Sequence, residues 1–384
     1  MFDIEYPKPA EKIILTAFYL SREDKELFDE DLEEMVMLCK TAGAEVVDTI
    51  IQKGSSPKAS TYLGSGKLKE ISQRMKELDC TTVVIDAELS PAQIRNIEKI
   101  ISGKVLDRNQ LILDIFALHA KTNEAKIQVE LAQLNTLYPR LTHAWSHLSK
   151  QIGGIGTRGP GEKQLEVDRR LVQKKITDLK KRLVKIEKSR KIQSQRRNNC
   201  YTIALVGYTN VGKSTLLNAL SGSDVLVENK LFATLDTATR KVYIPAVGDV
   251  IISDTVGFLR KLPHQLVASF KSTLEVVRDA DILLIVMDAS SSWRKEQFET
   301  VKKVLDELDI QESRELIIFN KKDIVEDEFV EKSISIEYKS PLFVSAFDSS
   351  DISQIRDSIS KMILDISMEK EKMNIINKTT IKFS

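Results

Sequence analysis

The residues best suited to do chemistry lie in one short stretch near the middle of the chain. Residues 207–214 read GYTNVGKS, which fits the spacing G-x-x-x-x-G-K-[ST], and they stand between an apolar run typical of a strand and the helical pattern TLLNAL. In such a loop glycines let backbone N–H groups wrap phosphates, the lysine reaches the β- and γ-phosphates, and the hydroxyl binds Mg²⁺. We therefore predict that Lys213 and Ser214 bind a nucleoside triphosphate and its magnesium ion.

A second motif, DTVG at 254–257, ends an apolar strand. Its Asp254 carboxylate can hold Mg²⁺ through water, and the N–H of Gly257 can contact the γ-phosphate. Between the two motifs, Thr234 is the candidate for a switch threonine whose hydroxyl ligates Mg²⁺ and whose backbone touches the γ-phosphate; a solvent-facing loop threonine is the alternative. The predicted magnesium ligands are Ser214, Thr234 and, through water, Asp254.

Two further motifs concern the base. Residues 320–323 read NKKD and end another predicted strand. The Asp323 carboxylate suits the N1–H and the exocyclic amine of guanine, a donor pair that adenine does not offer, and Asn320 would brace the loop and the base. Ser345 and Ala346 follow a further strand and can offer a backbone N–H to guanine O6. The order of the four motifs predicts GTP rather than ATP.

The residue after Gly257 bears on hydrolysis. Ras-type GTPases place there a glutamine that orients the attacking water, whereas this chain has Phe258, so hydrolysis should be slow until a partner completes the site. Asn210 raises the hypothesis of a K⁺ ion beside the phosphates. The predicted catalytic residues are Lys213, Thr234, Gly257 and Asn210. The predicted GTP contacts are Gly207, Tyr208, Thr209, Asn210, Val211, Gly212, Lys213, Ser214, Phe232, Ala233, Thr234, Leu235, Asp236, Asp254, Thr255, Val256, Gly257, Asn320, Lys321, Lys322, Asp323, Val344, Ser345 and Ala346.

Hydrophobic patterning indicates the elements that position these loops. Residues 1–124 alternate short apolar strands with polar-faced helices, which is typical of an α/β domain. Residues 199–366 predict a P-loop GTPase domain with a doubly wound, mainly parallel sheet, and 367–384 predict a polar C-terminal tail. The expected strands are 13–20, 45–52, 82–87, 104–107, 201–206, 249–253, 282–287, 315–319 and 342–344, and the expected helices of the first domain are 25–42, 67–78 and 90–101.

Residues 125–198, between these domains, follow a different pattern. Apolar residues recur at heptad spacing on both sides of a glycine-rich loop at 152–162, which predicts an antiparallel, coiled-coil-like helical hairpin; Arg169 is the polar member of the second seam, and Pro139 should kink or interrupt the first arm. Two ordinary amphipathic helices packed on a core are the alternative. Residues 121–200 hold 19 Lys and Arg against 7 Asp and Glu, which indicates a polyanionic partner.

The composition describes a globular protein. The 384 residues are 42% hydrophobic, yet the longest apolar run, 282–287, falls far short of the ~20 residues of a membrane span. The three cysteines have neither metal-ligand nor disulfide spacing, and the first residues lack a signal-peptide pattern. We expect a cytoplasmic protein without a membrane span, and a monomer.

Together with several other stretches, these motifs resemble the HflX family of translational GTPases over nearly the whole chain. GGIGTRGPGE at 153–162 is the most specific of them, although the family usually has Gly at the position of Ile152, Thr at that of Lys163 and Pro at that of Thr237. The other matching stretches are YLGSGK at 62–67, DAELSPAQ at 86–93, DRNQLILDIF at 107–116, QVELAQ at 128–133, FATLD at 232–236 and DTVGF at 254–258.

The resemblance implies a GTPase that binds the large (50S) ribosomal subunit and its rRNA, and that splits stalled or stressed ribosomes or acts in ribosome biogenesis. It also implies that the first domain and the hairpin face rRNA, with the hairpin loop directed at the peptidyl-transferase region. The RNA-contact candidates are Arg158, Gly153, Gly154, Gly156, Gly159 and Gly161.

Two other functions stay open at this point. The chain could be a GTP-sensing ribosome-binding module with little turnover, or an ATP-dependent rRNA-remodelling enzyme acting through its N-terminal domain, since ATP binding there is described for the family. Against the second, GSGK at 64–67 lacks the full phosphate-loop spacing and is more typical of a helix start.

Overall fold

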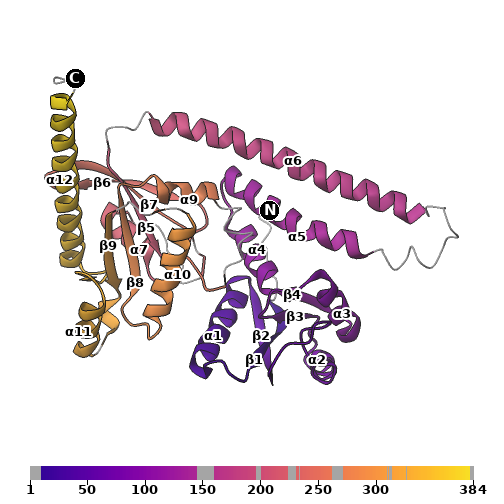
Figure 1. Ribbon diagram of the computed structural model, residues 1–384. Helices are drawn as coiled ribbons and strands as arrows, with labels where there is room; N and C mark the ends of the chain where they lie inside the picture. The colour runs from indigo at the N-terminus through magenta and orange to yellow at the C-terminus, as the bar shows by residue number, and fades with distance from the viewer. Residues whose placement is uncertain are drawn as a thin grey trace, which may run out of the picture. The chain divides into compact units, whose positions relative to one another are not determined.

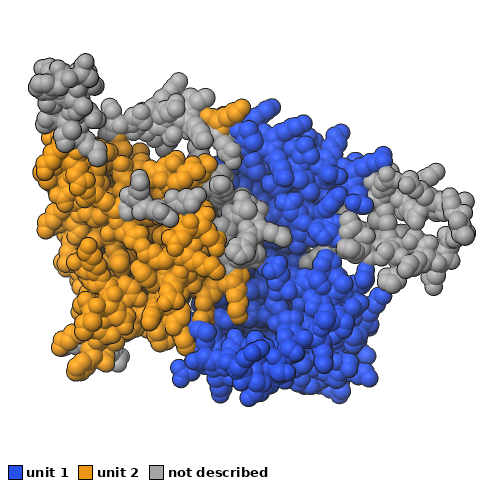
Figure 2. Space-filling view, viewed as in Figure 1, with its two compact units in different colours: residues 1–185 blue, residues 186–384 orange. Residues whose placement is uncertain are grey.

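A computed structural model describes residues 10–144, 160–195, 200–223, 231–232, 234–261, 271–308, 310, 314–325 and 327–380. The chain forms two compact units, residues 1–185 and residues 186–384, which Figure 2 shows in blue and orange. Within the described residues, no helix combines the length and the apolar character needed to cross a membrane.

The first unit contains a four-stranded, all-parallel sheet in the order β2-β1-β3-β4 (Figure 1). One of its two inner strands, β3, reads TVVI and is buried at every position, as expected where helices cover both faces of a sheet. The strands are β1 (Glu11–Leu20), β2 (Ala44–Gly54), β3 (Thr82–Ile85) and β4 (Lys104–Asp107), and the helices that alternate with them are α1 (Lys25–Thr41), α2 (Ser65–Glu77) and α3 (Pro91–Ile101). All four predicted strands and all three predicted helices are therefore present.

Local caps explain where the helices of this unit begin. Ser90 and Gln93 form a capping box ahead of α3, and Asp107 and Gln110 form another ahead of α4 (Arg108–His119), a helix that the sequence patterning did not predict. Gly64 is the N-cap of α2 and its N–H donates to the Gln52 side chain at 2.8 Å. The GSGK stretch is thus a helix start, as its spacing indicated.

Two long helices follow, α5 (Asn123–Ala144) and α6 (Pro160–Gln195). Within the first unit they run antiparallel, because Tyr138 of α5 meets Arg169 of α6 while Glu130, two turns earlier, meets Lys175, two turns later. The Arg169 guanidinium lies 5.6 Å from the centroid of the Tyr138 ring and donates to its hydroxyl at 3.4 Å, so this polar seam member contacts the opposite seam. The predicted helical hairpin is present.

Two details of the hairpin differ from the prediction. Helix α5 continues through Pro139 to Ala144, so of the predicted kink or interruption the interruption is absent; the neighbouring Tyr138 is held by its contact with α6. Helix α6 begins at Pro160, inside the predicted loop, because a proline is well suited to the first helical position, where its missing N–H has no partner to lose.

The second unit contains a six-stranded sheet in the order β10-β9-β8-β5-β7-β6, with only β6 antiparallel (Figure 1). The five predicted strands are present, and β6 is a sixth that the patterning missed. The strands are β5 (Thr202–Gly207), β6 (Ala238–Ile244), β7 (Gly248–Asp254), β8 (Ile282–Asp288), β9 (Arg314–Asn320) and β10 (Leu342–Phe343). The helices are α7 (Lys213–Ser221), α9 (Lys271–Arg278), α10 (Arg294–Glu307), α11 (Glu328–Glu337) and α12 (Ser349–Thr380), with a short 3₁₀ turn, η1, at Lys322–Ile324.

The predicted polar tail is helical over most of its length, because α12 continues to Thr380. Polar contacts hold this part of the helix to the sheet. Glu369 pairs with Arg314 at 2.5 Å, and Lys370 lies 3.5 Å from Asp281 and 5.2 Å from the centroid of the Tyr201 ring.

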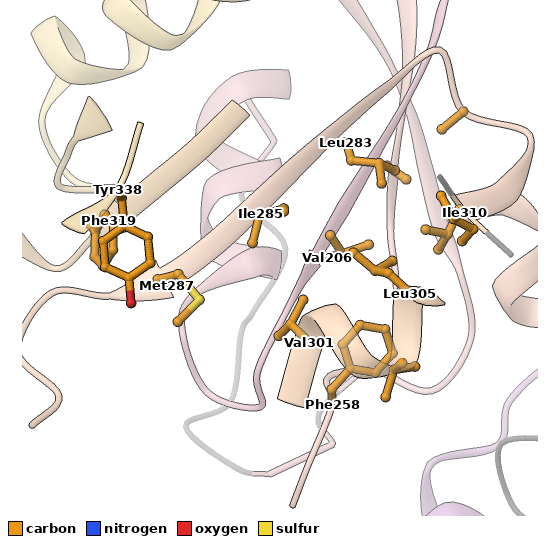
Figure 3. Close-up of a cluster of buried hydrophobic side chains, with 14 of the residues drawn as sticks. Val206, Phe258, Leu283, Ile285, Met287, Val301, Leu305, Ile310, Phe319 and Tyr338 are labelled. Carbon is orange, nitrogen blue, oxygen red and sulfur yellow. The ribbon is translucent and has the colours of Figure 1, made fainter. Parts of the chain in front are cut away.

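A hydrophobic cluster between the second sheet and its helices fixes the ends of the site loops (Figure 3). Phe258 lies in this cluster with Val206 of β5 and Val301 of α10, and its side chain is 2% exposed. The residue that stands where Ras-type GTPases have glutamine is therefore part of the core.

Candidate nucleotide-binding site

The phosphate-binding loop lies between β5 and α7, as its spacing predicted. Gly212 has φ +92° and a Cβ there would stand 2.3 Å from Asn320 Nδ2, so both the backbone conformation and the close approach require glycine. Asn210 adopts the left-handed conformation at φ +62°, which asparagine tolerates better than most residues. The loop thus turns back on itself at the end of the strand, the geometry that directs N–H groups at phosphate.

Lys213 begins α7 and folds back over the loop. Its Nζ donates to the carbonyl oxygens of Tyr208 at 2.7 Å and Gly207 at 3.2 Å. Burial lowers the pKa of the Lys213 ammonium to about 8, and the nearby Asp254 carboxylate opposes this shift. Among the described residues, the hydrogen-bond partners of this buried cation are two carbonyl oxygens, with one carboxylate nearby, so it is well placed to bind an anion.

The three predicted magnesium ligands meet beside Lys213. Ser214 Oγ lies 2.8 Å from Thr234 Oγ1 and donates to Asp254 Oδ2 at 2.6 Å. Burial raises the pKa of Asp254, while Lys213 and the hydrogen bonds from the two hydroxyls lower it. The other carboxylate oxygen, Oδ1, is buried without a hydrogen-bond partner in the described structure.

This arrangement fits a magnesium ion. Two hydroxyls and a carboxylate are hard oxygen donors, and a buried, unpartnered carboxylate oxygen is stabilised by a cation. The described residues contain no group of three or more His, Cys, Asp or Glu side chains that could form an all-protein metal cage. The set instead suits an ion that retains waters and binds substrate phosphates, as Mg²⁺ does.

The segment after Asp254 is hydrogen-bonded directly to the phosphate-binding loop. Phe258 N donates to Gly207 O at 3.0 Å, and Thr209 N donates to Phe258 O at 2.9 Å. Arg260 N donates to the Tyr208 hydroxyl at 2.9 Å, so this side chain braces the segment. A Cβ on Gly257 would stand 2.8 Å from Thr209 Cα and 3.0 Å from Lys213 Nζ, which places Gly257 against the lysine.

The base-binding motifs converge at the ends of β9 and β10. Asn320 is buried; its Nδ2 donates to Val211 O at 2.8 Å and its Oδ1 accepts from Ala346 N at 3.1 Å. It therefore ties the phosphate-binding loop to the last motif. Asp323 lies in η1 and is exposed, as a carboxylate that recognises a base must be before the base binds.

Comparison with the sequences of known proteins identifies the family to which the chain belongs. The chain is 49% identical over 313 residues to GTPase HflX of Flavobacterium psychrophilum, covering 82% of this chain and 76% of the relative. It is 45% identical over 319 residues to GTPase HflX of Escherichia coli, covering 83% and 74%. The chain belongs to the HflX family. It is thus a P-loop GTPase, and the recognition made from the motifs is confirmed.

Three family descriptions match successive parts of this HflX-family chain: "GTP-binding GTPase N-terminal" at residues 29–117, "GTP-binding GTPase Middle Region" at 119–197 and "50S ribosome-binding GTPase" at 202–321. Among solved structures, SsGBP in complex with GDP is 28% identical and superposes with a TM-score of 0.51, covering 92% of this chain and 99% of SsGBP. The predicted fold class is confirmed.

Two acidic residues of the HflX-family site were missed by sequence reasoning. Asp351 of α12 accepts from Ser345 N at 2.7 Å and pairs with Lys322 at 2.5 Å, and Asp288 at the end of β8 pairs with Lys321 at 2.6 Å. Asp288 carries a weak signal, since it ends an apolar strand next to the phosphate-loop strand. Asp351 has no such sequence signal, because only the folded structure brings α12 to the loop that contains Ser345.

The remaining predicted contacts divide into three groups. Thr255, Val256 and Val344 are buried, and Thr255 Oγ1 donates to Leu205 O at 2.7 Å, so their side chains support the loops from within. Phe232 and Leu235 are buried on either side of Thr234, while Asp236 is half-buried. Outside the described residues lie Ala233, Arg158, Gly153, Gly154, Gly156 and Gly159; Gly161 lies in α6.

Proposed function

We propose that this protein hydrolyses GTP on the large ribosomal subunit, in contact with its rRNA in the cytoplasm, and that it uses the nucleotide to split stalled or stressed ribosomes. The meeting of the buried Lys213 and Asp254 with the half-buried Ser214 and Thr234 carries the GTPase part of the proposal. Family membership and the description "50S ribosome-binding GTPase" support the ribosomal part.

The exposed face of α6 supports an RNA partner. Between residues 169 and 186 the only acidic residue is Asp178, and the basic residues are all exposed. Such a surface attracts phosphate-rich polymers and releases counterions when it binds them. The basic residues are Arg169, Arg170, Lys174, Lys175, Lys180, Lys181, Arg182 and Lys185.

In the proposed reaction, each group at the site has a separate task. Lys213 and the loop N–H groups bind the β- and γ-phosphates, and Asp323 selects guanine. Ser214, Thr234 and Asp254 would hold Mg²⁺, which neutralises charge on the phosphate oxygens when bound. Loss of the γ-phosphate removes its contacts to Thr234 and Gly257, which releases both segments and changes the affinity for the ribosome.

Single-turnover GTP hydrolysis with and without large subunits tests this function. We expect stimulation by large subunits, and separation of 70S ribosomes on sucrose gradients that depends on GTP. Reversing two charges of α6, Lys180→Glu with Lys181→Glu, should weaken subunit binding by about tenfold without changing hydrolysis by the free protein. The matched control reverses two exposed charges elsewhere, Lys332→Glu with Lys339→Glu.

The outcomes separate the alternatives. GTP-dependent subunit binding without stimulated hydrolysis would instead indicate a GTP-sensing module. RNA remodelling that needs ATP and survives Lys213→Ala would indicate an N-terminal ATPase.

We also propose that Asn210 helps to bind K⁺ beside the phosphates. Its left-handed backbone and half-exposed side chain at the mouth of the loop support this role. Equal turnover in K⁺ and Na⁺ would contradict it.

A further inference from the structure

Thr209 is a buried threonine of the phosphate-binding loop with no role in the interactions above beyond its backbone. It is 5% exposed, and its hydroxyl oxygen has no hydrogen-bond partner among the residues that the structure describes. The buried threonine of the next loop, Thr255, donates to a carbonyl oxygen at 2.7 Å. Because an unmade hydrogen bond in the interior costs free energy, the hydroxyl of Thr209 is free to bond a group that arrives with the substrate.

The position of Thr209 defines where that partner must be. A Cβ on Gly257 would stand 2.8 Å from Thr209 Cα, 2.8 Å from Thr209 Cγ2 and 3.0 Å from Lys213 Nζ. Thr209 therefore lies beside the two groups assigned to the γ-phosphate, the Gly257 N–H and the Lys213 ammonium. Its backbone is fixed there as well, since Thr209 N donates to Phe258 O at 2.9 Å.

The usual water-positioning side chain is missing from this neighbourhood. Phe258 follows Gly257, but its ring lies in the hydrophobic cluster with Val206 and Val301 and is 2% exposed (Figure 3). It has no polar atom with which to hold a water. Thr209, which lies against Gly257 and close to the Lys213 ammonium, carries a hydroxyl that can supply one.

We infer that the Thr209 hydroxyl hydrogen-bonds the water that attacks the γ-phosphorus. In the reaction the water oxygen bonds to the γ-phosphorus while the bond from phosphorus to the β–γ bridging oxygen breaks; GDP leaves, and a water proton passes to the phosphate product. Thr209 accepts a hydrogen bond from this water and exchanges no proton. This role rests on the proposed GTP hydrolysis and adds a catalytic residue from the phosphate-binding loop.

Thr209→Val tests the inference, because valine keeps the shape of threonine and removes only the hydroxyl. We expect kcat for GTP to fall by about tenfold to a hundredfold, with and without large subunits, while KM and the affinity for GDP change less than twofold. Thr209→Ser keeps the hydroxyl and should retain most of kcat. Thr300→Val on α10, whose hydroxyl donates to Glu296 O at 2.8 Å, is the matched change away from the site.

Either of two results would overturn the role of Thr209: a Thr209→Val protein with the original kcat, or a Thr209→Ser protein as slow as Thr209→Val. A loss of GDP affinity in Thr209→Val would likewise show that the residue only maintains the shape of the loop. Failure of the proposed ribosomal function gives a distinguishable result. Large subunits would then stimulate hydrolysis by neither the unaltered protein nor its variants, and the comparison of their basal kcat values would still test the role of Thr209.

Discussion

Binding of GTP should take up a proton above pH 8, because Lys213 is buried in the free protein and its pKa is lowered to about 8. Triphosphate oxygens bring negative charge to contact distance and restore the pKa toward or above the ordinary lysine value. Between these two pKa values the free protein must gain a proton at Lys213 before it binds GTP fully. The affinity for GTP therefore falls by up to about tenfold for each pH unit above 8.

The size of the uptake follows from the same pKa. With a pKa of about 8, Lys213 is neutral in about a tenth of the free protein at pH 7 and in about three quarters at pH 8.5. Isothermal titration calorimetry in two buffers of different ionisation enthalpy measures the protons taken up. We expect about 0.1 proton per GTP at pH 7 and about 0.75 at pH 8.5.

Two variants test whether Lys213 is the residue that takes up the proton when GTP binds. Lys213→Met should bind GTP more weakly and show no additional uptake at pH 8.5, whereas Lys302→Met, which changes a lysine paired with Glu315 away from the site, should behave as the unaltered protein. Equal proton uptake at the two pH values in the unaltered protein would refute the argument from burial.

Three further changes test other parts of the molecule. Asp323→Asn should lower the affinity for GTP and raise it for xanthosine triphosphate, measured by competition binding, because the amide offers a donor where the carboxylate offers an acceptor. Asn320→Ala leaves a buried N–H and a buried carbonyl without partners and should lower the free energy of unfolding by about 2 kcal/mol in urea titrations. Arg108→Met strips two buried carboxylates of their cation and should lower the free energy of unfolding by about 3–5 kcal/mol, whereas Arg74→Met, at a solvent-exposed pair, should lower it far less.

The loops of the site could be predicted because their residues are consecutive in sequence and each follows a buried strand. Strand β8 reads ILLIVMD and needs no tertiary information to be placed in the centre of a parallel sheet. Once the four motifs are each assigned to a strand end, the topology brings them to one edge. The meeting of Ser214 and Asp254 follows from that edge, whereas Thr234 lies in the segment before β6, and only its contact with Ser214 in the folded structure places it there.

The missed features depend on contacts between distant residues. Strand β6 reads ATRKVYI and buries only Val242 and Ile244, so its pattern is weak without its partner strand β7. The end of α12 is polar, and its ion pair with Arg314 and its cation–π contact with Tyr201 become visible only when the sheet is folded. Hydropathy cannot register stabilisation of this kind.

One arrangement links the chemistry of the phosphates to the rest of the GTPase unit. Lys213 donates to the carbonyl oxygens of residues 207 and 208, and the segment 258–260 is hydrogen-bonded to residues 207–209. A γ-phosphate that draws the Lys213 ammonium away from those carbonyls therefore acts on two of the three loop residues that hold the segment after Gly257. Since Phe258 anchors this segment in the core beside α10, a shift of the loop is transmitted to packed elements rather than dissipated in a surface loop. Phe258 therefore anchors the segment after Gly257 in the core, but it has no polar atom that could position a water. In the proposed mechanism the hydroxyl of Thr209, in the phosphate-binding loop, positions the water instead.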